Sequence, residues 1–70
     1  MKNKIKRIHF IGIGGSGMSG IAEVMQTLGF TVSGSDLAIS DTIKSLKKLG
    51  IKVYSQHHKA NIKKVDTIVF

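Results

Sequence analysis

The sequence predicts an α/β fold: a Rossmann-like parallel sheet of four strands with two main helices, as a truncated piece of a larger doubly wound domain. Three observations predict it. Short apolar runs alternate with segments of helical period along the 70 residues, the pattern of parallel strands joined by helical crossovers. No hairpin signal joins neighbouring runs, which argues against antiparallel pairing. A glycine-rich loop separates the first run from the first helix.

The first half of the chain predicts a strand, a helix and a second strand. The first strand, Ile5–Ile13, is a nearly continuous apolar run, typical of a buried strand. The apolar residues of the helix fall at i, i+3, i+4, i+7 and i+10: Met18, Ile21, Ala22, Met25 and Leu28. This spacing places them on one helix face, and Gly29 can terminate the helix. The second strand is predicted over Phe30–Ser35.

The second half predicts another helix and two more strands. Ser40 or Asp41 can cap a helix that runs to Leu49, with Gly50 as its stop. Strands are predicted over residues 51–54 and 65–70, and a polar segment with a helical turn over residues 56–64. Right-handed crossovers would place both helices on one face of the sheet and leave the other face nearly bare. We therefore interpret the chain as a piece of a longer domain.

The composition narrows the function classes. There is no cysteine, which excludes a disulfide framework and a cysteine metal site. The first apolar run breaks at Gly12, too early for a signal peptide or a membrane span, so a cytoplasmic location is expected. The formal net charge is +7, from 11 Lys and Arg against 4 Asp and Glu. Such an excess raises the question of a nucleic-acid or membrane partner.

The positions of the basic residues argue against such a partner. Most of them precede or open predicted strands, at the edge opposite the strands' carboxyl ends: Lys2, Lys4, Lys6, Arg7, Lys52, Lys63 and Lys64. Lys47 and Lys48 end the second helix, where they favour its dipole. No aromatic interleaving or recognition-helix pattern accompanies them. We expect a solvated basic surface, with neither a nucleic-acid nor a membrane partner.

The loop Gly12-Ile13-Gly14-Gly15-Ser16-Gly17 fits G-x-G-x-x-G between a strand and a helix. In this motif we expect Gly12 to permit a tight turn, Gly14 to let a phosphate approach, and Gly17 to allow close helix–strand packing. The helix offers unpaired N–H groups and its positive dipole end to an anion, and Ser16 can add a hydroxyl donor. The alternative is a glycine-rich structural turn.

Polar residues follow the second and third predicted strands. Asp36 lies 19 residues after Gly17, where a carboxylate in this fold accepts hydrogen bonds from a ribose diol; alternatively it forms a turn. His57 and His58 can hydrogen-bond a base, ribose or phosphate, or be ordinary loop histidines. Adjacent histidines point apart, so no two-histidine metal site is expected. His9, inside the first strand, is expected to be structural.

The segment Ile8–Glu23, IHFIGIGGSGMSGIAE, resembles the start of the Mur ligase family of peptidoglycan synthesis. The resemblance covers nearly the whole chain and includes further pieces: Gly29-Phe30, VSGSD at residues 32–36, Leu49-Gly50-Ile51 and Gln56-His57. Murein-peptide ligases share much of this pattern. Gly17-Met18-Ser19-Gly20 is closer to the alanine-adding branch of the family.

The resemblance implies a three-domain cytoplasmic enzyme that adds L-alanine to UDP-N-acetylmuramate, through an acyl phosphate formed with ATP and magnesium. Residues 1–70 would be the amino-terminal part of the UDP-substrate-binding domain, with the remaining domains in cis. By position in the family, the diphosphate would contact Gly14, Gly15, Ser16, Gly17 and Met18. The uridine would lie by Asp36, Leu37 and His57. No catalytic residue and no metal ligand is expected in this segment.

The sequence contains no G-x-x-x-x-G-K-S/T motif. ATP and magnesium are therefore expected to bind elsewhere in the parent enzyme, and this segment alone cannot perform phosphoryl transfer. Two other functions remain open from the residues alone. An NAD-binding domain of an oxidoreductase would use the same glycine motif and Asp36. A non-catalytic module that senses nucleotides would use the same fold.

Overall fold

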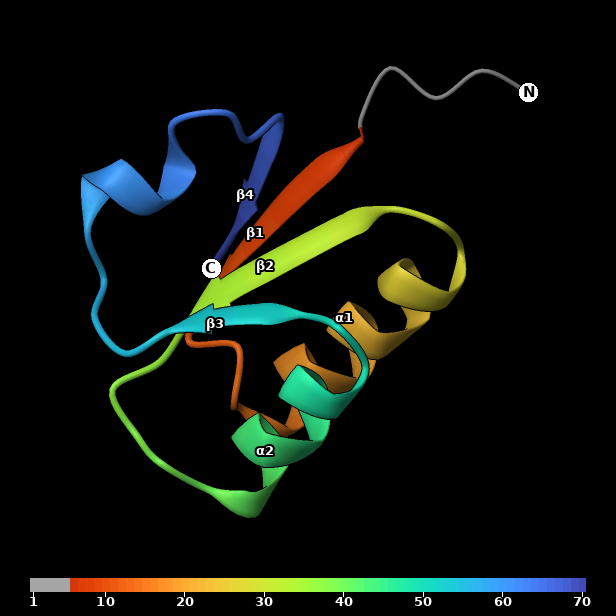
Figure 1. The fold of residues 1–70 in the computed structure, drawn as a ribbon, viewed down its shortest axis with the longest axis vertical. Coiled ribbons are helices and arrows are strands. Elements are labelled where there is room, and N and C mark those ends of the chain that lie inside the picture. The colour runs from red at the N-terminus through yellow and green to blue at the C-terminus, as the bar shows by residue number, and fades with distance from the viewer. Residues whose placement is uncertain (1–5) are drawn as a thin grey trace.

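A computed structural model describes residues 6–70. Four parallel strands form one sheet in the order β3-β2-β1-β4: β1 (Arg7–Ile11), β2 (Thr31–Ser35), β3 (Lys52–Tyr54) and β4 (Thr67–Val69). The helices α1 (Ser16–Thr27) and α2 (Asp41–Lys48) lie on one side of the sheet, and the short 3-10 helix η1 (Lys59–Ile62) lies on the other (Figure 1). The predicted fold class and order of elements are confirmed.

The first strand is shorter than predicted at its carboxyl end. It ends at Ile11, because Gly12 turns the chain with a φ of 78° and the N–H of Ile13 donates across to the carbonyl of Ser35. A positive φ of this size is easily reached only by glycine. The predicted start at Ile5 lies outside the described residues, as do Lys2 and Lys4.

Both main helices end where the sequence predicts. Gly29 and Gly50 take up left-handed conformations, with φ of 100° and 90°, as expected of residues just past a helix end. At the start of α2 the two candidate caps are resolved in favour of Ser40. Its Oγ accepts a hydrogen bond from the N–H of Ile43 at 3.2 Å, while Asp41 occupies the first turn, where a negative charge favours the helix dipole.

The core lies between the sheet and the two helices. It is made of apolar residues that are almost fully buried: Ile8, Phe10, Ile13, Ala22, Val32, Ile43, Leu46 and Ile51. The chain after β1 packs directly on β2 at Gly34, where a Cβ would collide with the side chain of Ile13. Glycine at this position therefore sets how closely the loop after β1 approaches the sheet.

The apolar stripe predicted on α1 is only partly buried. Ala22 is fully buried and Met18 and Met25 pack against the core, but Ile21 and Leu28 are 50% and 65% exposed. The reason is that α1 contacts β2 and α2, and these elements cover only one edge of the stripe. Within residues 6–70, no other helix packs over the exposed edge.

The face of the sheet opposite the helices is polar and not as bare as predicted. His9, Ser33 and Ser35 point to this face, and η1 crosses over it (Figure 1). His9 is only 1% exposed, and its Nδ1 lies 2.8 Å from the Oγ of Ser33. The structural role predicted for His9 is thus confirmed. Burial, reinforced by the nearby His57, lowers the pKa of its imidazole, which favours the neutral ring.

Candidate functional site

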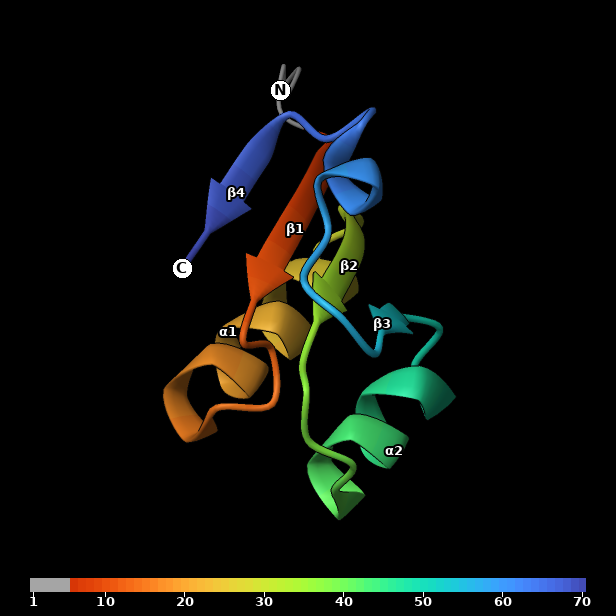
Figure 2. The same ribbon diagram turned by 90° about the vertical axis from the view of Figure 1, so that its left-hand side faces the viewer.

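The glycine-rich loop lies at the carboxyl edge of the sheet, between β1 and the start of α1 (Figure 2). The direction of the strand order reverses next to this loop. From β1 the chain moves through β2 to β3 on one side, and then returns to place β4 on the other side of β1. Open α/β sheets bind ligands at such a switch in strand order, outside the carboxyl ends of the strands.

The loop is tied to the end of β2 by backbone hydrogen bonds. The carbonyl of Ser35 accepts from the N–H groups of Gly12 and Ile13, at 2.8 and 3.1 Å, and the N–H of Gly15 donates to the carbonyl of Gly12 at 3.0 Å. Together with the positive φ of Gly12, these bonds confirm the tight turn expected of the first glycine in the motif.

Gly14 serves a purpose that the sequence did not predict. Its N–H donates to Oδ2 of Asp36 at 2.8 Å. A Cβ at this position would lie 2.8 Å from that same oxygen and 2.9 Å from Cδ1 of Ile43. The missing side chain therefore makes room for a carboxylate and an isoleucine of the protein.

Gly17 also departs from its expected purpose. A Cβ built on it would meet nothing within 4 Å, so close helix–strand packing does not require glycine there. The close approach expected of Gly17 is found instead at Gly34. Gly17 is exposed at the beginning of α1, and its missing side chain leaves open space on the solvent side of the loop.

The beginning of α1 offers free hydrogen-bond donors. The first backbone hydrogen bond of the helix runs from the N–H of Ser19 to the carbonyl of Gly15, at 2.8 Å. The N–H groups of residues 16–18 precede it and have no partner within the helix. Ser16 and Gly17 are exposed, and Met18 is half-buried. Three donors at the positive end of a helix are suited to binding an anion.

Asp36 and Leu37 line a hollow of about 300 Å³ between α2 and the segment that follows β2. Half of the residues that line it are apolar, and the others include two lysines and a tyrosine: Asp36, Leu37, Ala38, Ile39, Ile43, Lys44, Lys47, Val53, Tyr54 and Ser55. This volume is at the lower end for small-molecule sites. Leu37 is 71% exposed, so its side chain is free to pack against a ligand.

Lys44 and Lys47 in this hollow were missed by the sequence reasoning, which placed the positive charge away from the loop and gave Lys47 only a helix-dipole role. The signal was present in the spacing. Lys47 lies four residues after Ile43, and residues four apart share one face of a helix. Because Ile43 packs on Gly14, that face is the one turned toward the glycine-rich loop.

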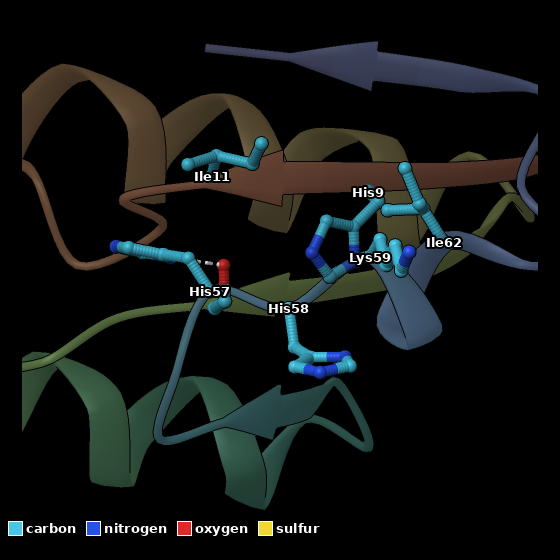
Figure 3. A pocket seen from close by; sticks show the side chains of 7 residues that line it. His9, Ile11, His57, His58, Lys59 and Ile62 are labelled. Atoms are coloured by element: carbon cyan, nitrogen blue, oxygen red, sulfur yellow. Dashed lines mark hydrogen bonds between the residues drawn. The ribbon is translucent and has the colours of Figure 1, made fainter.

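His57 lies beside a different hollow, of about 240 Å³, on the face of the sheet that carries η1. Its Nδ1 hydrogen-bonds the Oγ of Ser35, which is fully buried (Figure 3). His58 points away from His57 and its Nδ1 accepts the N–H of Ala60 at 3.0 Å. The prediction that the adjacent histidines diverge is confirmed.

The structure therefore divides the residues expected around the uridine. Asp36 and Leu37 lie together, but none of the residues lining their hollow also lines the hollow of His57. The two hollows are separated by the sheet, because Val53 and Ile43 lie on its helical side while His9 and Ile11 face η1. Sequence spacing placed all three residues at the carboxyl edge but did not distinguish the two faces.

Among residues 6–70, no group of three or more His, Asp or Glu side chains is placed to hold a metal ion. The phosphate-binding motif of ATP sites is missing from the sequence. In the same described range, no helix has the length and apolar character needed to cross a bilayer.

Comparisons with known proteins show that this chain is similar to a family of ligases. A family model described as "Mur ligase family, catalytic domain" matches residues 7–70. Among curated proteins, the UDP-N-acetylmuramate–L-alanine ligases of a Polaromonas species and of Nitrosospira multiformis are 58% and 56% identical over 69 residues, or 99% of the chain. The chain spans only 15% and 14% of the lengths of these two relatives.

Solved structures share the fold. A murein peptide ligase from Psychrobacter arcticus superposes with a TM-score of 0.85 at 30% identity, over 91% of this chain and 14% of its own. The UDP-N-acetylmuramate:L-alanyl-gamma-D-glutamyl-meso-diaminopimelate ligase from Neisseria meningitides gives 0.82 at 39% identity, over 91% and 21%. The sheet, the helices and the loop described above are thus an arrangement found in larger ligases.

Proposed function

This chain belongs to the Mur ligase family, and from that premise we propose that it is the UDP-binding part of an ATP-dependent ligase of peptidoglycan precursor synthesis. The proposed reaction of the whole protein is the addition of L-alanine to UDP-N-acetylmuramate, which is the reaction in the names of the curated relatives. Because the chain spans about 15% of those relatives, the chemistry is assigned to the whole protein and substrate binding to this segment.

The observation that carries the proposal is the open end of α1 at the switch in strand order. We assign the diphosphate to the loop Gly14–Met18, with the N–H groups of Ser16, Gly17 and Met18 as the donors. The N–H groups of Gly14 and Gly15 already have acceptors within the protein, so their part is to shape the loop. Backbone donors and the helix dipole stabilise a diphosphate without a lysine clamp.

The uridine is assigned to the hollow that contains Asp36 and Leu37. The exposed Leu37 side chain offers an apolar surface to a pyrimidine ring, and Lys44 and Lys47 offer donors beside it. His57 was grouped with these two residues by family position, and in this proposal it contacts the same ligand from the other face of the sheet. Its Nδ1 is engaged with Ser35, which leaves Nε2 to bind a phosphate or sugar oxygen.

We assign ATP and magnesium to the proposed whole enzyme rather than to this segment, because the sequence has no G-x-x-x-x-G-K-S/T motif and residues 6–70 hold no group of three or more His, Asp or Glu placed to bind a metal ion. L-Alanine is likewise assigned to parts of the protein beyond this fold. When bound, ATP supplies the phosphoryl group that activates the carboxylate of UDP-N-acetylmuramate. The contribution of this chain is to hold the nucleotide end of the substrate, which positions its other end for the reaction. The proposed location is the cytoplasm, where nucleotide-linked precursors and ATP are found.

Calorimetric titration of the intact protein tests this function. We expect UDP-N-acetylmuramate and UDP to bind, uridine to bind at least tenfold more weakly because it lacks the diphosphate, and NAD not to compete. Preferential binding of NAD would contradict the proposal and favour an oxidoreductase domain. Equal affinity for UDP and uridine would remove the diphosphate from the glycine-rich loop.

A further inference from the structure

Asp36 has both of its carboxylate oxygens bound to backbone N–H groups of the protein. Oδ2 accepts from Gly14 at 2.8 Å, and Oδ1 accepts from Ala38 at 2.8 Å. The second bond closes a turn between an Asp and the residue two positions later, a local arrangement that fixes the side chain. The backbone of Asp36 is itself held, because its N–H donates to the carbonyl of Tyr54 at 3.0 Å.

The carboxylate therefore joins three parts of the carboxyl edge: the glycine-rich loop, the end of β2 and the segment leading to α2. Its place against the loop is built into the sequence, since a side chain at Gly14 would collide with Oδ2. Ile43 from α2 closes the other side of the same space, with its Cδ1 2.9 Å from where that Cβ would be. A half-buried carboxylate is thus fitted to one particular loop conformation.

We propose that Asp36 is a positioning residue that holds the glycine-rich loop in the conformation that binds the diphosphate, rather than a ligand of the ribose. In the usual dinucleotide fold the acid after the second strand accepts the ribose hydroxyls. In this chain the carboxylate is turned inward, onto Gly14, and the bond to Gly14 sets the direction in which residues 16–18 present their N–H groups. The inference rests on the proposed function, since it assumes that the loop binds a diphosphate.

The change in diphosphate affinity on removing the charge of Asp36 distinguishes a positioning role from an incidental contact. A carboxylate close to a bound diphosphate repels it, so removing the charge of a merely adjacent Asp36 would tighten diphosphate binding. A positioning carboxylate has the opposite effect, because its loss frees the loop to adopt other conformations. The sign of the change in affinity is therefore informative before its size is considered.

The first measurement needs no ligand. Hydrogen exchange of the Gly14 amide is followed in the intact protein, in an Asp36→Ala variant and in an Asp36→Asn variant, which retains one acceptor oxygen and the shape of the side chain. We expect exchange at Gly14 to accelerate at least tenfold in Asp36→Ala and less in Asp36→Asn. Asp41→Asn is the matched control: it removes an exposed carboxylate in the first turn of α2, and Gly14 should exchange as in the wild type.

The second measurement pairs the variants with altered ligands. Affinities for UDP and for 2′,3′-dideoxy-UDP are measured with the wild type and with Asp36→Ala. A positioning residue predicts a loss of roughly tenfold or more for both ligands, the size expected for a lost hydrogen bond to a charged group. A ribose ligand predicts a loss for UDP that disappears with the dideoxy compound. If Asp36→Ala does not fold, Asp36→Asn is compared in the same way.

Three results would overturn the inference. They are an unchanged exchange rate at Gly14 in both Asp36 variants, a loss of affinity confined to UDP, and a variant that binds UDP more tightly than the wild type. Failure of the wild type to bind UDP would instead refute the proposed function. In that case the exchange rate at Gly14 still decides whether Asp36 positions the loop.

Discussion

Two aspartates secure opposite ends of the strand β1, and they do so in different ways. At the carboxyl edge, Asp36 uses one oxygen on Gly14 and the other on Ala38. At the amino edge, a single oxygen of Asp66, Oδ2, accepts the N–H groups of Lys6 and Arg7 at 2.9 and 2.8 Å. Both carboxylates bind backbone donors across a long separation in sequence.

The two aspartates differ in their exposure and in the part of the fold that each one holds. Asp66 is exposed, beside the cations Lys6 and Arg7, and the two N–H groups it accepts lower the pKa of its carboxyl. It joins the beginning of β4 to the beginning of β1. Asp36 is half-buried beneath a loop whose outer side is open. The same interaction therefore joins two strands at one edge of the sheet and holds the glycine-rich loop at the other.

The largest expected effect comes from a methyl group at Gly14. In Gly14→Ala the new Cβ would lie 2.8 Å from Oδ2 of Asp36, so the carboxylate or the loop has to move. We expect a destabilisation of about 1–3 kcal/mol, as for other overpacked sites, and at least a tenfold loss of UDP affinity. Urea denaturation and calorimetry measure the two effects.

Gly20→Ala is the control for this change. Gly20 lies within α1, and a Cβ there would meet nothing within 4 Å. Because alanine favours a helix over glycine, the variant should be more stable by up to about 1 kcal/mol with unchanged affinity. If Gly14→Ala were as stable as Gly20→Ala and bound UDP normally, the packing of Asp36 against the loop would be irrelevant.

A change in stability of intermediate size is expected at His9, which lies within β1 between the two edges of the sheet. Burial lowers the pKa of His9, so the unfolded chain binds a proton more readily than the folded one. The stability due to the neutral ring is complete above the ordinary histidine pKa of about 6.5 and is lost as the pH falls through the folded pKa. Thermal unfolding should therefore show lower stability at about pH 5.5 than at about pH 7.5.

His9→Asn should reduce this pH dependence, since its amide can still reach the Oγ of Ser33 but does not titrate. His58→Asn replaces an exposed histidine and should leave the dependence nearly unchanged. An equal pH dependence in wild type and His9→Asn would show that the buried imidazole does not control it.

The smallest effect is expected at Asp66. Its pKa is lowered by the N–H groups of Lys6 and Arg7, so its contribution to stability is present above the ordinary carboxyl pKa of about 4. It is lost as the pH falls through the lower folded pKa. Asp66→Asn should be slightly less stable at neutral pH and should lose less stability on acidification, as measured by urea denaturation. UDP affinity should not change, in contrast to Asp36→Ala; a comparable loss would erase the difference between the two edges.

What the sequence predicted well depends on local patterns. Gly12, Gly29 and Gly50 were identified because each follows a strand or helix signal, and all three have a positive φ. The glycine-rich loop was found in the same way, from its spacing and its place between two elements. The order of elements and the family followed from these features.

What the sequence did not predict depends on contacts between distant segments. The bond from Gly14 to Asp36 spans 22 residues, and no spacing rule indicates that the carboxylate turns inward. His57 was grouped with Asp36 and Leu37 by position in the family, although the chain after β3 crosses to the opposite face of the sheet. Loop paths of this kind are set by tertiary packing and not by the period of the residues.

The most direct test of the central claim is the amide spectrum of the isotope-labelled intact protein, recorded with UDP and with uridine. The account predicts that UDP shifts the amide signals of Ser16, Gly17 and Met18, while uridine leaves them in place. The amide of Gly14 should move little, because it remains bound to Asp36. If UDP binds and the signals of residues 16–18 do not shift, or if uridine shifts them equally, the beginning of α1 does not hold the diphosphate.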